Sequence, residues 1–143
     1  MPPIINDVAT DLEDTPAFVK ASVGELPDSF KEQIKKAYAD LKPLVLESQD
    51  KPTVFKTAAK LAEETARWQV THQDEEAGII EGVATTGLLR FKDDFVVRIK
   101  DAEGSGVVVD MRSKSRVGKG DLGANAARIR EYFAALTKAV SSE

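Results

Sequence analysis

The sequence has no cysteine and only one histidine. Without cysteine there can be no disulfide, no thiolate nucleophile and no cysteine-ligated zinc, and we expect neither a metal site nor a cofactor. No apolar run approaches the length of about 18 residues that is typical of a membrane-spanning helix. We therefore predict no membrane span.

The N-terminus also lacks the features of a secretory leader. Residues 1–7 have no basic start, and their apolar run is only two residues long, Ile4-Ile5. A signal peptide needs both a charged start and a longer apolar stretch. We expect a cytoplasmic location for the sequence as given, and a periplasmic or membrane-associated one if an upstream leader was removed.

What is present is the composition of a folded protein. The 143 residues are 42% hydrophobic and 31% charged, which excludes a wholly disordered or collagen-like chain. This length is typical of one domain that is large enough to bury its own core. We predict a single domain over 1–143, with an irregular acidic arm at 1–26 and an α+β core at 27–143.

Charge is unevenly distributed along the chain. The net charge is −4, which argues against a nucleic-acid partner. Residues 1–50 contain ten acidic and five basic residues, whereas residues 111–130 contain one acidic and six basic residues. The basic segment has no aromatic residues among its cations on which bases could stack. The positive charge of this segment is therefore either neutralised by the acidic arm or available to an anionic partner.

Hydrophobic periodicity indicates the elements of the core. The connections between the longer strands are too short for parallel crossovers, so we predict an α+β fold: an antiparallel sheet of about four to five strands with helices packed on one face. We expect Asp121 to cap the last helix and Leu122 to be the first residue of the apolar stripe that packs on the sheet. The expected elements are a helix from 27 that Pro43 ends, a strand at 44–46, a helix at 50–65, strands at 68–72, 79–86, 88–100 and 107–117, and a helix at 121–140.

Charged residues alternate with apolar ones along the strands at 88–100 and 107–117. One face would collect Asp94, Arg98, Asp110, Arg112 and Arg116, as a solvated, ion-paired face or as an anion-binding one, because opposite charges across strands stabilise each other. Asp93 instead interrupts the apolar face. A buried carboxylate needs partners, which Ser113, Ser115 or the arm could supply.

The segment before the last helix reads Gly118-Lys-Gly-Asp-Leu-Gly123. It matches a dinucleotide-binding pattern by letter, but no βαβ unit surrounds it. It is either a turn that needs glycines with positive φ or an anion site at a helix start, where Asp121 would compete. Asp121, Asn125 and Arg128 are spaced so that they form a polar stripe along the last helix. This stripe is either a solvated side of the helix, or it contacts the acidic arm or the polar face of the sheet.

The run Val109-Asp-Met-Arg-Ser-Lys-Ser-Arg-Val-Gly-Lys-Gly-Asp-Leu-Gly-Ala-Asn-Ala-Ala-Arg-Ile129 resembles the bacterial and plastid family called domain of unknown function 1499. Three further stretches are similar to that family, at 5–11, 37–43 and 91–98. The resemblance covers about residues 4–136 and assigns no function. It implies that the polar residues of these motifs belong together. We hypothesise that acids of the arm dock onto the arginines at 112 and 116 through bidentate bonds.

These patterns favour a non-enzymatic binding or interaction module, with an unknown protein or a small anionic ligand as partner. One alternative is an enzyme acting on a small anionic substrate, with Arg112 and Arg116 as clamps and Asp93 or Asp94 as acid/base. Another is a scaffold in an envelope-associated assembly. Saturation of those two arginines by Asp7 or Asp11 would count against an anion site. The candidate ligand-binding residues are Arg98, Arg112, Ser113, Ser115, Arg116, Asn125 and Arg128, and the candidate structural polar network is Asp7, Thr10, Asp11, Asp110 and Asp121.

Overall fold

The computed structural model describes residues 1–142, within which there are three helices and six strands. The helices are α1 (Asp28–Ala37), α2 (Lys51–Glu64) and α3 (Ala124–Ser141). The strands are β1 (Asp7–Ala9), β2 (Leu44–Leu46), β3 (Trp68–Asp74), β4 (Ile79–Thr85), β5 (Lys92–Asp101) and β6 (Val107–Ser115).

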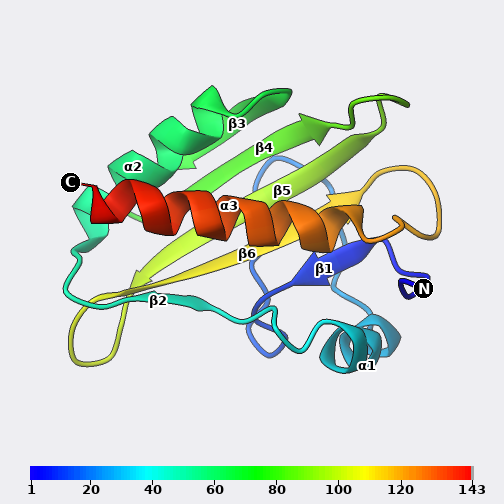
Figure 1. The fold of residues 1–143 in the computed structure, drawn as a ribbon, viewed down its shortest axis with the longest axis horizontal. Coiled ribbons are helices and arrows are strands. Elements are labelled where there is room, and N and C mark those ends of the chain that lie inside the picture. Colours follow the sequence, from blue (N-terminus) through cyan, green and yellow to red (C-terminus); the bar gives the residue numbers. More distant parts are fainter. Residues whose placement is uncertain (143) are drawn as a thin grey trace.

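All six strands belong to one antiparallel sheet (Figure 1). The order is β1-β6-β5-β4-β3, and β2 also pairs with β6. The predicted α+β class is confirmed, with one strand more than the upper expectation because the arm is not wholly irregular. Residues 7–9 are too few to show an alternating pattern, and their pairing with Arg112–Lys114 of β6 makes them a strand.

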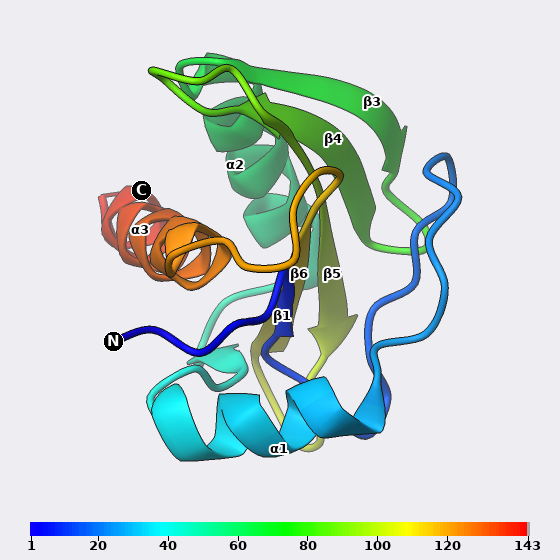
Figure 2. The same ribbon diagram turned by 90° about the vertical axis from the view of Figure 1, so that its right-hand side faces the viewer.

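The sheet is covered on both faces. Helices α2 and α3 pack on one face, and the blue segment that follows β1 crosses the other (Figure 2). Helix α1 lies at one end of the sheet, near β1. The strands in the middle are therefore buried on both sides, and Phe95, Val96 and Val97 in succession are each 0% exposed.

A buried glutamate fastens the arm to this second face. Glu81 of β4 is 1% exposed. Its carboxylate accepts hydrogen bonds from the backbone N–H groups of Val19, Lys20 and Ala21, at 2.5, 2.9 and 2.8 Å. One side chain thus satisfies three successive donors of a segment that has no helix or strand of its own.

The core between the helices and the sheet follows the predicted stripe of α3. Ile129 and Leu136 are fully buried. The Phe95 ring lies beneath β4, where a Cβ on Gly82 would come within 2.6 Å of it. Glycine at that position is therefore needed for the ring to approach the strand.

Three predicted boundaries are wrong. The strand expected from Leu88 begins at Lys92, because Thr86 and Phe91 bond each other and close a turn before it. The last helix begins at Ala124, two residues later than a cap at Asp121 would place it, and Leu122 is 85% exposed instead of being part of the buried stripe. The first helix ends at Ala37, well before Pro43.

Candidate functional site

Strand β6 and the arm are joined by a buried ion pair. Arg112 donates from Nε and Nη2 to the two carboxylate oxygens of Asp7, at 3.0 and 2.7 Å. Its Nη2 also donates to the carbonyl oxygen of Gly24, at 2.9 Å, and the Phe18 ring lies 5.2 Å from the guanidinium carbon. The side chains of Arg112 and Asp7 are 5% and 1% exposed. Residues of the arm thus accept the hydrogen bonds of Nε and Nη2 of this arginine.

A second cluster surrounds Arg98 of β5. Its guanidinium lies 3.2 Å from Asp11, 3.7 Å from Asp14 and 3.4 Å from Asp110. Thr10 donates to Asp110 at 2.6 Å. Two acids of the arm and one of β6 therefore share one arginine.

Arg116 is paired differently from the hypothesis. It binds Asp94 of the neighbouring strand β5 with two hydrogen bonds of 3.0 and 2.9 Å, and no acid of the arm. The hydrogen bonds that Arg116 donates to Asp94 raise the pKa of its guanidinium. Arg98, Arg112 and Arg116 thus all have carboxylate partners within the chain, and anion binding by them stays a prediction that requires breaking these pairs.

Burial raises the pKa of the Asp110 carboxyl, an effect that outweighs the hydrogen bond from Thr10 and the nearby Arg98; the charge of Asp11 raises it further. The folded state therefore holds this proton more tightly than the unfolded state, so the contribution of Asp110 to stability is lost as the pH rises through its folded pKa.

We expect Asp110→Asn to gain stability relative to wild type between strongly acidic and neutral pH. Urea unfolding of both proteins across that range measures the difference. A difference in the free energy of unfolding that does not change with pH, or that shifts in favour of wild type as the pH rises, would contradict this prediction.

A polar network fills the start of the interface between α3 and the sheet. Asn125 is 0% exposed. Its Oδ1 accepts from Ser113 and Arg128, and its Nδ2 donates to Ser115 and Asp121. The polar stripe of the last helix is therefore tied to the sheet and is not a solvated flank.

Asp121 fills the helix start, as the sequence indicated that it would. Its carboxylate accepts from the N–H groups of Gly123, at 2.8 Å, and Asn125, at 3.2 Å. Gly118 and Gly123 adopt positive φ angles of 89° and 84°. The glycine segment is therefore a turn whose anion position is already taken by a side chain of the chain itself.

Arg128 is held by one of its nitrogens. Its Nη1 donates to Ser113 at 3.1 Å and to Asn125 at 3.0 Å, and lies 2.8 Å from a carboxylate oxygen of Asp93 outside hydrogen-bond geometry. Asp93 is 2% exposed, and Arg128 supplies the opposite charge that a buried carboxylate needs, while Oδ2 of Asp93 accepts no hydrogen bond within residues 1–142. Both acid/base candidates, Asp93 and Asp94, are thus buried carboxylates that pair with an arginine, although the Arg116 side chain that pairs with Asp94 is itself 46% exposed.

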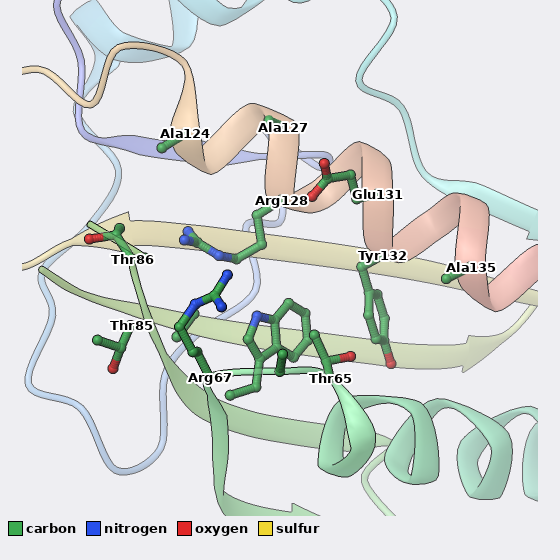
Figure 3. A pocket seen from close by; sticks show the side chains of 14 residues that line it. Thr65, Arg67, Thr85, Thr86, Ala124, Ala127, Arg128, Glu131, Tyr132 and Ala135 are labelled. Atoms are coloured by element: carbon green, nitrogen blue, oxygen red, sulfur yellow. The ribbon is translucent and has the colours of Figure 1, made fainter. Parts of the chain in front are cut away.

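Arg128 also lines a pocket of about 490 Å³ between α3, the α2–β3 turn and the end of β4. Figure 3 shows the guanidinium groups of Arg67 and Arg128 pointing towards each other inside it. Trp68 lies in its wall, with its ring stacked 5.3 Å from that of Tyr132. We take this pocket as the candidate functional site.

Arg67 and Trp68 are not among the site residues predicted from the sequence. Arg67 has a φ of 64°, a conformation that glycine or asparagine adopts more readily than arginine does. The backbone of the turn thus gains nothing from arginine, which points to a role for the side chain. No pattern in the sequence reveals a positive φ at a residue that is not glycine.

Within residues 1–142, no group of three or more histidine, aspartate or glutamate side chains is placed to hold a metal ion. None of the helices there has the length and apolar character needed to cross a membrane. Residues 7–136 match the profile of the family described as "Protein of unknown function (DUF1499)". No match was found among curated proteins.

Proposed function

This chain belongs to the DUF1499 family of proteins of unknown function, and we propose that it is a non-enzymatic binding module for a small organic anion. The ligand lies in the pocket between α3 and the α2–β3 turn. Its carboxylate or phosphate sits between Arg67 and Arg128, and its apolar body lies against the aromatic wall.

The observation that carries the proposal is the pair of facing guanidinium groups in Figure 3. Arg67 makes no ion pair or side-chain hydrogen bond within residues 1–142, unlike Arg98, Arg112 and Arg116. Asp93 balances the charge of Arg128, so Arg67 is the guanidinium of this site that has no counter-ion in the described part of the chain, and an anion between the two would supply one. Arginine is also suited to bind carboxylates and phosphates through two parallel bonds.

Arg128 is already fixed in position for such a ligand. All its bonds to Asp93, Ser113 and Asn125 use Nη1, so Nη2 and Nε form no hydrogen bond within the described chain. Its side chain is 11% exposed, and little conformational entropy is left to lose when it binds. This matches the preorganisation expected of a binding site.

The pocket walls determine the rest of the ligand. The indole N–H of Trp68 has no acceptor within residues 1–142 and is a third donor, beside an apolar surface of rings and alanines. Among residues 1–142, Glu131 is the only acid in the lining, and it is exposed. A ligand with one anionic group and an aromatic or aliphatic body fits this combination.

Thermal unfolding with benzoate, phenyl phosphate and inorganic phosphate tests the proposal. A ligand at about ten times its Kd adds about 1.4 kcal/mol of stability, which raises Tm by about 3–6 °C in a domain of this size. We expect benzoate or phenyl phosphate to produce this rise. Inorganic phosphate, which has no apolar body, should give a smaller one.

Arg67→Gly should abolish that rise without harming the fold, because glycine adopts the positive φ of this position freely. Arg90→Gly is the matched control, since Arg90 is also exposed, has a φ of 55° and does not line the pocket. A rise that survives in Arg67→Gly, or no rise with any of the three probes, would refute the pocket as an anion site.

A further inference from the structure

Exposed apolar side chains gather on two neighbouring loops. Nine large apolar side chains within residues 1–142 are exposed, and five of them line one hollow of about 330 Å³. Both loops, β4–β5 and β6–α3, extend from the same end of the sheet in Figure 1. We call these five residues the apolar loop surface: Leu88, Leu89, Phe91, Val117 and Leu122.

These side chains contribute little to the fold. Leu88 is 92% exposed and Leu122 is 85% exposed. Leu122 also has a φ of 54°, where leucine is strained and glycine or asparagine is not. A residue that is both strained and exposed is better explained by a contact outside the chain, and a cluster of such residues marks an interaction site.

The β4–β5 loop holds its leucines in a defined turn. The backbone N–H of Thr86 donates to the carbonyl oxygen of Phe91 at 2.8 Å, and the N–H of Phe91 donates to the Thr86 hydroxyl at 2.8 Å. Leu88 and Leu89 project from the tip that these two bonds close. The loop therefore presents its apolar residues without a further ordering step.

Cations alternate with these apolar residues along both loops. Arg90, Lys92 and Lys119 are exposed, and none makes an ion pair or a side-chain hydrogen bond within residues 1–142. The acids of this end are occupied, since Asp94 binds Arg116 and Asp121 binds the start of α3. The surface therefore combines apolar tips with unneutralised positive charge.

We propose that the apolar loop surface docks onto an anionic lipid bilayer. Leu88, Leu89 and Leu122 enter the interfacial region, and the three free cations contact lipid phosphates. Charge complementarity selects this partner, because apolar groups interleaved with cations match a surface whose charge is negative and whose interior is apolar. The inference is independent of the anion pocket, which these three leucines do not line.

Cosedimentation with lipid vesicles tests this docking. We expect the protein to bind vesicles of phosphatidylglycerol mixed with phosphatidylcholine, to bind phosphatidylcholine alone much more weakly, and to lose affinity as salt is added. Leu88→Ser/Leu89→Ser should weaken binding to the mixed vesicles by about tenfold or more. Leu122→Asn should weaken it with an unchanged or higher Tm, which separates docking from folding.

The matched control is Val19→Ser/Val45→Ser, which removes two exposed apolar side chains, 56% and 55% exposed, outside this surface. It should leave vesicle binding unchanged. No binding to the mixed vesicles, equal binding to both kinds, or an equal loss in the control would overturn the proposal. Self-association in sedimentation velocity that the leucine variants abolish would also overturn it, in favour of a second copy of the chain.

Discussion

Replacing Asp7 with alanine should lower the free energy of unfolding by about 3–5 kcal/mol, because it leaves a buried guanidinium without its counter-ion. The Arg112 side chain is 5% exposed and bonds both oxygens of Asp7. Few single substitutions reach that range, and the loss would account for a large part of the stability of a small domain. Urea denaturation followed by circular dichroism gives the measurement.

Asp40→Ala is the control for an exposed pair. Asp40 binds Arg130 with two bonds of 2.6 and 2.9 Å, and the Arg130 guanidinium lowers the pKa of the Asp40 carboxyl. The two side chains are nevertheless 60% and 43% exposed, so removing the pair should cost less than about 1 kcal/mol. Equal costs for Asp7→Ala and Asp40→Ala would show that burial does not decide the strength of these pairs.

A double variant distinguishes the cost of leaving a buried charge unpaired from the contribution of the ion pair itself. Asp7→Leu/Arg112→Met replaces both charges with apolar side chains and leaves no unpaired charge behind. Such exchanges are often close to neutral, so we expect the double variant to be markedly more stable than Asp7→Ala. If it is less stable, the charges themselves, with the contacts of Arg112 to Gly24 and Phe18, hold the arm.

Glu81→Ala should produce the second large effect. An unsatisfied buried donor costs about 1–3 kcal/mol, and this change frees the three N–H groups of Val19, Lys20 and Ala21 at once. Because water can reach part of this exposed segment, we expect a total loss of about 2–4 kcal/mol. Trypsin should cleave after Lys20 at least about tenfold faster, as expected when local opening becomes easier by more than 1.4 kcal/mol.

Glu63→Ala is the matched control, because Glu63 is an exposed glutamate whose carboxylate accepts one side-chain hydrogen bond within residues 1–142, from Gln73 at 2.7 Å. This variant should leave cleavage after Lys20 unchanged. An unchanged cleavage rate in Glu81→Ala would show that the arm is held on the sheet by its ion pairs alone.

The long elements could be predicted from the sequence because their patterns are local. The apolar spacing of α3 and the alternation in β3 each report the face that packs on the core. The uneven charge also pointed towards contact between the arm and the basic strand, which the structure places at Arg112 and Asp7. This contact could be predicted because the acidic residues are concentrated in one segment of the chain and the basic residues in another.

The rest depends on contacts between distant segments. The pocket is formed where the α2–β3 turn, β4 and α3 meet, and nothing close to Arg67 in the sequence indicates that Arg128 faces it. Glu81 did leave a readable signal, since it interrupts an apolar run from Ile79 to Ala84 just as Asp93 interrupts another. A carboxylate inside a strand that is otherwise apolar indicates a buried acceptor even when its donors cannot be identified.

An NMR titration of the Trp68 indole N–H tests whether an organic anion binds in the pocket, and it follows a single signal because the chain has one tryptophan. If an organic anion binds between Arg67 and Arg128, phenyl phosphate or benzoate should shift this signal to saturation in the wild type and leave it unmoved in Arg67→Gly. A signal that stays in place at millimolar ligand, or moves equally in both proteins, would show that no organic anion binds between these two arginines.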